Sequence, residues 1–290
     1  MMETIPASPA NETCLLLEGR RCRWSLGRRT LIMGVLNVTP DSFSDGGRYL
    51  ERAAAIERAL EMVEEGADII DVGGESTRPG ATPVPLDEEL QRVIPVIEEL
   101  SKGDIPLSID TTKAEVAHQA LECGVEMVND VSALSFDREM ASVCARYSPA
   151  VVLMHMRGTP MTMQRNVAYR NIVGEVTDYL RERIAYAVQR GVPLSRIAVD
   201  PGIGFGKSAE DNLRLLNHLN ALEALGRPVV IGTSRKSFIG KALGREVEDR
   251  LEGTAATVAL GIVRGAHIVR VHDVGSMRMV ADMADAIMES

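Results

Sequence analysis

Short apolar runs alternate with amphipathic stretches along most of the chain, a pattern that predicts strands followed by helices. Between the strands, apolar residues recur at helical spacing, as in 51–66 and 251–265. The predicted strands are rich in Val, Ile and Leu, as strands buried on both faces are. They span 30–38, 68–74, 105–110, 126–131, 149–155, 196–200, 228–234 and 267–273.

This succession of strand and helix units predicts an α/β fold, a (β/α)₈ TIM barrel, because an open doubly wound sheet usually has fewer strands. Ahead of the units, residues 13–29 predict a short N-terminal β-hairpin around Gly19 and Arg20, which we expect to plug the N-terminal mouth of the barrel. No linker or charge block divides the chain. We expect a single domain over 13–290 and a disordered or irregular N-terminus over 1–12.

The composition restricts the classes of partner that the protein can bind. The chain has 290 residues, of which 45% are hydrophobic and 3% aromatic, and its net charge is −9. A negative chain lacks the basic face that non-specific nucleic-acid binding needs, and few aromatic residues are present to stack on bases. No run approaches the roughly 18 apolar residues of a membrane span. We expect small-molecule substrates, with no nucleic acid and no membrane as partner.

The cysteines and the N-terminus indicate a compartment. The cysteines show no C-x-x-C spacing and are interpreted as small apolar side chains in a reducing environment: Cys14, Cys22, Cys123 and Cys144. The first residues, MMETIPASPANET, lack the basic and apolar regions of a signal peptide. The protein is therefore predicted to be cytoplasmic.

The stretch DPGIGFGKS (200–208) resembles a phosphate-binding loop but misses both patterns. A P-loop needs glycine where Pro201 stands, and a dinucleotide fingerprint needs a third glycine where Lys207 stands. Lys207 is interpreted as a solvated residue at the start of a helix. Phe205 either lines a pocket wall or packs in the core.

Polar residues cluster where the predicted strands end. In a (β/α)₈ barrel these ends form the active site. Any one of these residues could cap a helix, but capping does not explain a whole rim of them: Asn37, Asp110, Asn129, Asp200, Lys236, Arg270 and His272. Their carboxylates, carboxamide and lysine match the donors and acceptors of a flat heterocycle such as an aminopyrimidinone. Arg78, Arg270 and His272 offer positive charge to an anion such as phosphate.

Seven motifs, in unbroken order over residues 30 to 274, resemble those of dihydropteroate synthase. They are LNVTPDSFSDGG (36–47), DVGGESTRPGA (71–81), SIDT (108–111), VND (128–130), DPGIGFGK (200–207), TSRKSFIG (233–240) and RVHDV (270–274). The resemblance implies an enzyme that joins p-aminobenzoate to a dihydropterin-CH₂-diphosphate and releases pyrophosphate, in folate biosynthesis.

The resemblance also implies roles for individual residues. The pterin diphosphate would contact Thr77, Asp110, Asn129, Asp200, Lys236, Arg270, Val271 and His272, and Asn37 would hold Mg²⁺ as the cofactor. The p-aminobenzoate site would comprise Phe43, Thr77, Arg78, Pro79 and Ser234, next to Lys236. Lys236, Arg270, His272, Asp45 and Arg78 would be the catalytic residues. Phe43 and Asp45 lie on a first loop and 77–79 on a second, and we expect both loops to be mobile without ligand.

Two rival functions share parts of this pattern. A pterin-binding methyltransferase domain would not need STRPG, SRKS and RVHD together. A catalytically silent pterin-binding paralogue has no reason to retain Lys236, Arg270 and both loops. The apolar segments GTAATVALGIVRG (253–265) and MRMVADMADAIM (277–288) predict a homodimer face, or alternatively pack only on the barrel.

Overall fold

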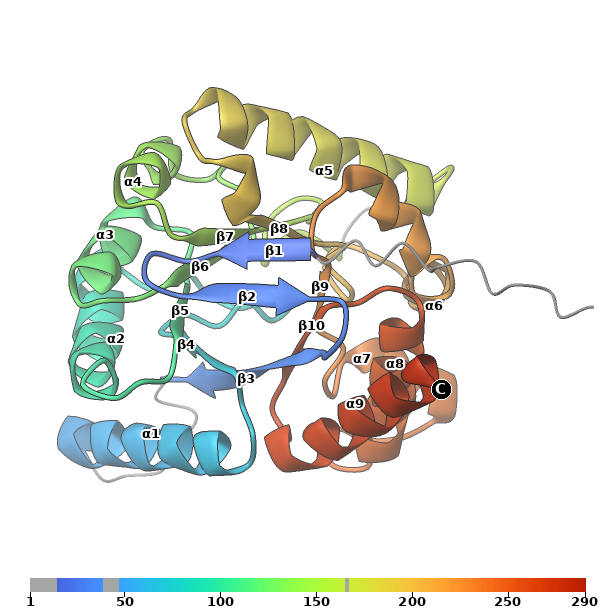
Figure 1. Ribbon diagram of the computed structural model, residues 1–290, viewed down its shortest axis with the longest axis horizontal. Helices are drawn as coiled ribbons and strands as arrows, with labels where there is room; N and C mark the ends of the chain where they lie inside the picture. The colour runs from blue at the N-terminus through green and yellow to red at the C-terminus, as the bar shows by residue number, and fades with distance from the viewer. Residues whose placement is uncertain (1–14, 39–46, 165–166) are drawn as a thin grey trace, which may run out of the picture.

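The computed structural model describes residues 15–38, 47–164 and 167–290. An eight-stranded parallel sheet has the order β8-β7-β6-β5-β4-β3-β10-β9. Its two end strands meet through a parallel bridge between Val199 and Val229, and the Val199 N–H donates to the Pro228 carbonyl at 2.8 Å. The sheet therefore closes into a (β/α)₈ TIM barrel, with helices outside it (Figure 1).

The elements follow one another as strand and helix. The strands of the barrel are β3 (Leu31–Asn37), β4 (Ile69–Gly73), β5 (Leu107–Asp110), β6 (Met127–Asp130), β7 (Ala150–Met154), β8 (Ile197–Asp200), β9 (Val230–Ile231) and β10 (Ile268–Val271). The α-helices are α1 (Gly47–Glu64), α2 (Leu86–Leu100), α3 (Ala114–Glu122), α4 (Met140–Tyr147), α5 (Ile172–Gln189), α6 (Ala209–Asn217), α7 (Ser237–Leu243), α8 (Leu251–Val263) and α9 (Val274–Glu289). Two 3₁₀ segments, η2 (Leu194–Arg196) and η3 (Leu219–Leu225), flank β8 and α6.

Two apolar layers follow from the alternation of side chains along each strand. Outward residues such as Ile70, Val128 and Val199 pack against the helices in the main core. Inward residues such as Ile69 and Ala198 form a second, smaller cluster inside the barrel. Both faces of the sheet are thus buried, which explains why the strands read as continuous apolar runs.

The predicted N-terminal hairpin is present and closes one end of the barrel. It consists of β1 (Leu15–Glu18) and β2 (Arg23–Leu26), which pair antiparallel. Its buried side chains Leu17, Trp24 and Leu26 belong to the cluster inside the barrel. Figure 1 looks onto the end of the barrel that β1 and β2 cover.

The predicted strands match the observed ones closely, except the one at 228–234. There only Val230 and Ile231 form a strand, β9, because the chain then turns away, and Arg235 takes a positive φ of 55°. The prediction for residues 1–12 lies outside the described residues. Within the described part of the chain, no helix is long and apolar enough to cross a membrane.

Candidate functional site

The strands bring their polar residues inside the barrel through the same alternation that builds its core. Ile69 of β4, Ala198 of β8 and Ile268 of β10 point into the barrel. Side chains two positions further along point the same way, namely Asp71, Asp200 and Arg270. Asp110 and Asn129 occupy paired positions on the adjacent strands β5 and β6. The predicted polar rim is therefore a real feature of the fold.

Arg270 lies at the centre of this rim. Its Nε donates to Asp71 Oδ2 at 2.6 Å, and an η nitrogen donates to Asp110 Oδ2 at 2.7 Å. Asn129 Nδ2 also donates to Asp71 Oδ2, at 2.9 Å. The sequence analysis missed Asp71, although a carboxylate two residues before the end of an apolar strand, on its inward face, was the available signal.

Two carboxylate oxygens of this network remain without a partner. Asp71 Oδ1 and Asp110 Oδ1 are buried and accept no hydrogen bond from any described residue. Burial raises the pKa of Asp110 to about 7, although the Arg270 charge opposes the shift. Unpaired buried acceptors are costly, so these atoms are suited to a ligand that brings N–H donors.

Asp200 is held by the loop that follows it, residues 201–206, which we call the glycine loop. Its Oδ1 accepts from the Gly202 N–H at 2.6 Å. Gly202, Gly204 and Gly206 all have positive φ, at 66°, 87° and 63°. A Cβ at Gly202 would lie 1.9 Å from the His155 carbonyl oxygen, so only glycine fits this turn.

Lys236 reaches the site from the other side of the glycine loop. Its Nζ donates to the Ile203 carbonyl and lies 4.5 Å from the centre of the Phe205 ring. Burial lowers the pKa of Lys236 to about 8, against the attraction of Asp200. Phe205 is partly buried and packs against a methionine-rich cluster beside the site, so it contacts both the core and Lys236.

The interpretation of Lys207 as a solvated residue is wrong. Its side chain is 3% exposed, and Nζ lies 2.8 Å from Gly202 O, 3.0 Å from Phe205 O, 3.3 Å from His155 O and 2.9 Å from His155 Nδ1. The glycine loop folds back over the ammonium and supplies two of these carbonyls, and His155 supplies the third. Ser208, not Lys207, caps the helix α6, by accepting from the Asp211 N–H.

Ser234 and His272 form a pair next to Arg270. Ser234 Oγ lies 2.9 Å from His272 Nδ1 and accepts from the His272 backbone N–H at 3.2 Å. Burial and the Arg270 charge lower the pKa of His272 to about 4. The imidazole is therefore neutral near pH 7, and the expectation that it brings positive charge is wrong for the protein in this state. It can still donate a hydrogen bond.

The second loop lies at the rim, with Thr77 partly buried and Arg78 and Pro79 exposed. The Gly80 N–H donates to Pro160 O at 3.0 Å, which joins this loop to the one after β7. Phe43 and Asp45 of the first loop lie outside the described residues. The expectation that both loops are mobile stays a prediction.

Asn37 and Val271 differ in what they present to the rim. Asn37 ends β3, is partly exposed and aligns with Gly73 of β4. Val271 is fully buried in the core between strands and helices, so only its backbone can contact a ligand. Among the described residues, no group of three or more His, Cys, Asp and Glu could hold a metal.

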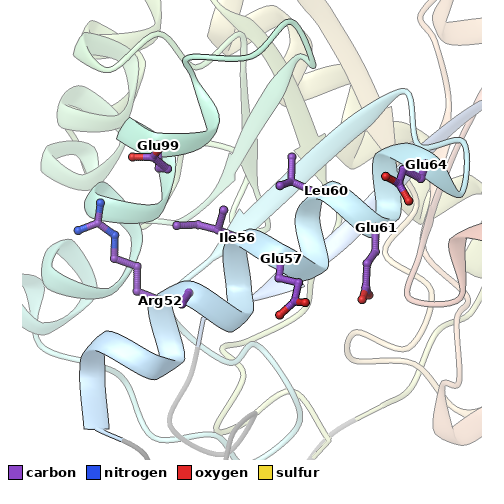
Figure 2. A pocket seen from close by; sticks show the side chains of 8 residues that line it. Arg52, Ile56, Glu57, Leu60, Glu61, Glu64 and Glu99 are labelled. Carbon is purple, nitrogen blue, oxygen red and sulfur yellow. The ribbon is translucent and has the colours of Figure 1, made fainter.

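A separate hollow lies on the outside of the barrel, between α1 and α2. Figure 2 shows side chains from both helices around it, among them Ile56, Leu60, Arg52 and Glu99. Glu57, Glu61 and Glu64 also line it. Its excess of carboxylates would repel an anionic ligand, so it does not compete with the rim as a site for a phosphate compound.

Comparison with known proteins gives consistent matches. Residues 33–272 match the family model described as pterin binding enzyme. The chain is 50% identical over 263 residues to the dihydropteroate synthase of Synechocystis sp., covering 90% of this chain and 91% of that protein. Among solved structures, the Clostridium difficile enzyme in the presence of pteroic acid is 51% identical with a TM-score of 0.87, over 92% of this chain and all of that one. The Xanthomonas albilineans enzyme with 4-aminobenzoic acid is 45% identical with a TM-score of 0.89, over 96% of this chain and all of that one.

Proposed function

The chain belongs to the pterin-binding enzyme family as a dihydropteroate synthase, and from this membership we propose how its residues share the reaction. The enzyme is a transferase of folate biosynthesis. It condenses p-aminobenzoate with (7,8-dihydropterin-6-yl)methyl diphosphate to give 7,8-dihydropteroate and pyrophosphate. The observation that carries the residue assignment is the pair of buried carboxylates with unpaired oxygens beside Arg270.

The pterin ring binds, in this proposal, between Asp110, Asn129, Asp200 and Lys236. The ring carries amino and ring N–H donors, which suit the unpaired Asp110 Oδ1. Lys236 offers a donor to the ring's acceptors and lies against Phe205. The glycine loop has no side chain at Gly202 and Gly204, which lets a flat ring approach its backbone closely.

The diphosphate binds next to the ring, at Arg270, His272 and the backbone of Val271. Arg270 has a fork of donors, of which Nε and an η nitrogen already hold Asp71 and Asp110. Its remaining N–H groups, which hold no other described residue, can meet an anion. His272 donates from its neutral ring, with Ser234 fixing the ring's other nitrogen. An anion at this position would raise the pKa of His272 from about 4 by attraction of the protonated form.

Mg²⁺ is the proposed cofactor, held on the protein side by Asn37. The residues fit such an ion: Mg²⁺ keeps several waters and needs few protein oxygens when a phosphate is present, and Asn37 presents a carboxamide at the rim. When bound, the ion would neutralise negative charge on the departing pyrophosphate.

The p-aminobenzoate site is proposed at the second loop, with Thr77, Arg78 and Pro79 above Ser234. Arg78 is exposed at the rim, yet it is close enough to His272 to help lower the pKa of that imidazole. A guanidinium there can pair with the carboxylate of p-aminobenzoate. Phe43 of the first loop completes the proposed p-aminobenzoate site.

The reaction needs little proton transfer from the protein. The bond between the pterin methylene carbon and the diphosphate oxygen breaks, and the electron pair leaves with the diphosphate while the pterin stabilises the cation. The neutral aniline nitrogen attacks the methylene and then releases its proton to solvent. Arg270, His272, Arg78 and Lys236 position the reactants and stabilise charge, and Asp45 on the first loop helps to exclude water.

Turnover with and without a chelator tests this assignment. We expect dihydropteroate to form with Mg²⁺ and to disappear with chelator, and Asn37→Ala to raise the Mg²⁺ concentration needed for half-maximal rate. A rate that chelator leaves unchanged would exclude the metal role of Asn37. Tight binding of pterin diphosphate without turnover would instead indicate a silent paralogue.

A homodimer through α8 and α9 is the proposed assembly. The two helices pack side by side (Figure 1). Their outer sides expose Leu260, Met279, Met283 and Ile287 by 60% to 69%, which is much apolar surface for a monomer. Sedimentation should show a dimer that the double variant Met279→Lys with Met283→Lys dissociates, while Leu60→Lys on α1 leaves it intact. A wild-type monomer would exclude the proposal.

The cytoplasm is the proposed location. Among the described residues Cys22, Cys123 and Cys144 are free thiols, as expected of a protein in a reducing compartment. A fluorescent fusion or fractionation of cells would test it.

A further inference from the structure

The most unusual buried group without a role in the proposed reaction is the ammonium of Lys207. It lies below the glycine loop, with Gly202 O and Phe205 O on one side and His155 Nδ1 and O on the other. The three backbone oxygens can only accept, and a protonated amine has three N–H donors, the most an amine can offer. These oxygens and His155 Nδ1 share the three donors, and the contact to His155 O, at 3.3 Å, is the longest of the four. Burial lowers the pKa of Lys207 well below its ordinary value and the Asp200 charge opposes that shift. The three accepting oxygens around Nζ favour the protonated form, so we take Lys207 as a cation.

His155 is built to receive this cation. Burial and the Lys207 charge lower the pKa of His155 to about 2, so the ring is neutral and Nδ1 accepts while Nε2 carries the proton. Tyr179 meets the ring edge-on, with centroids 4.9 Å apart. The His155 backbone N–H donates to the Asp200 carbonyl at 2.9 Å. The cation thus ties the glycine loop to the end of β7.

The same loop carries Lys236 on its other side. The Ile203 carbonyl accepts from Lys236 Nζ, and a Cβ at Gly204 would lie 2.9 Å from Lys236 Cδ. Asn212 Oδ1 fixes Gly204 by accepting its N–H at 2.7 Å. Different carbonyls of one loop therefore bind two lysines: Gly202 O and Phe205 O bind Lys207, and Ile203 O binds Lys236 at the site.

We propose that Lys207 is a positioning residue for pterin diphosphate binding: by holding the Gly202 and Phe205 carbonyls it fixes the loop whose Ile203 carbonyl places Lys236. The inference rests on the proposed role of Lys236 in the pterin site. Lys207 does not touch the substrate, so its effect must pass through Lys236. Asn212 on α6 supports the same loop, so Asn212→Ala should also weaken pterin diphosphate binding.

The test is a double-mutant cycle on pterin diphosphate affinity, measured by calorimetry below the unfolding temperature of every variant. Lys207→Met removes the ammonium and keeps the length of the side chain. We expect it to weaken binding at least tenfold with Lys236 present and less than twofold in a Lys236→Ala background. The KM for p-aminobenzoate at saturating pterin diphosphate should change less than twofold.

The matched control is Arg278→Met, which removes a buried cation at the other end of the barrel, where Arg278 donates to Thr30 O at 2.9 Å. It should lower the stability and leave pterin affinity unchanged. If Lys207→Met does not fold, Asn212→Ala takes its place in the test. We expect it to weaken pterin diphosphate binding threefold or more, and this loss should disappear in a Lys236→Ala background.

Two results would overturn the inference. One is unchanged affinity in the folded Lys207→Met or Asn212→Ala variant, and the other is an equal loss with and without Lys236. Failure of the proposed function looks different, because Lys236→Ala alone would then bind pterin diphosphate as tightly as the wild type.

Discussion

The two ends of the barrel are built from the same alternating strands, yet their buried and partly buried carboxylates have partners at one end and keep unpaired oxygens at the other. At the hairpin end, Glu126 accepts from the Arg21 backbone N–H at 2.8 Å and from its Nε at 2.7 Å, and Asp68 accepts from the Ile32 N–H at 2.8 Å. At the loop end, Asp71 and Asp110 each keep one oxygen unpaired. At the hairpin end the protein pairs these carboxylates itself, and at the loop end it keeps carboxylate oxygens for a ligand.

The difference teaches where stability and function reside. The hairpin end fills its interior with Leu17, Trp24 and Leu26, and its charges are local pairs. The loop end buries carboxylates and cations at a cost in folding free energy, and it places them with glycines that have positive φ. Changes at the hairpin end should alter stability alone, and changes at the loop end should alter activity.

Trp24→Ala should give the largest effect and leave catalysis intact. The side chain is 8% exposed and fills the barrel's N-terminal mouth, and loss of a buried Trp costs about 3–5 kcal/mol of unfolding free energy. Urea denaturation measures this cost, and kinetics of the variant at low temperature should give unchanged KM values. A raised KM for either substrate would show that the two ends are coupled.

Lys236→Ala should lower activity without lowering stability, the opposite of the result expected for Trp24→Ala. Loss of a charged hydrogen bond, worth about 1.5–3 kcal/mol, should lower kcat/KM on the order of 10–100-fold. Stability should stay the same or rise, because burial already disfavours this cation. Lys241→Ala on the exposed side of α7 is the matched control and should change neither property. Equal losses in the two variants would refute the assignment of Lys236.

The stability of the protein should depend on pH with opposite sign at the two ends of the barrel. The folded pKa of Asp110, about 7, lies above the ordinary value of 3.8, so its contribution to stability is complete below pH 3.8 and is lost as pH rises towards 7. Glu126 has a lowered pKa because hydrogen bonds from Arg21 outweigh its burial. Its contribution is present above pH 4.5 and is lost as pH falls below that value.

Asp110→Asn and Glu126→Gln should each remove one of these opposite slopes from a series of denaturation curves. Binding to Asp110 should follow its ionisation. Affinity for a hydroxymethyl dihydropterin, which lacks the titrating diphosphate, should fall by up to about tenfold per pH unit below 7 and be flat in Asp110→Asn. A flat wild-type profile would contradict the pKa of Asp110.

The same alternation explains how much of the molecule could be predicted from its sequence. Strands buried on both faces are continuous apolar runs, so the barrel and the polar residues at its strand ends were predicted. The role of Lys207 could not be read from its neighbours, since lysine is mostly exposed in proteins and nothing adjacent in the sequence indicates burial. Only the fold brings the carbonyls of Gly202 and Phe205 back over its ammonium.

Asp71 and His272 depended on partners far away in the chain. The role of Asp71 follows from its hydrogen bond with Arg270, which lies 199 positions later in the chain. The neutral state of His272 depends on burial and on the Arg270 charge. Hydrophobic periodicity reports which face a side chain takes, but it carries no information on which charges meet there. These two features therefore depend on contacts between segments that are distant in the sequence.

Arg21→Ala should have the smallest effect, and it tests whether the hairpin end really satisfies itself. The Arg21 side chain is 69% exposed while Glu126 is 4% exposed, so solvent screens much of the ion pair and the loss should be only about 0.5–1 kcal/mol of unfolding free energy. Glu126 keeps the backbone N–H groups of Arg21 and Cys22, which alanine does not remove. Denaturation and steady-state kinetics measured together decide the point. A loss of several kcal/mol would mean that Glu126 depends on one exposed cation, and the contrast with Asp71 and Asp110 would then be one of degree rather than of kind.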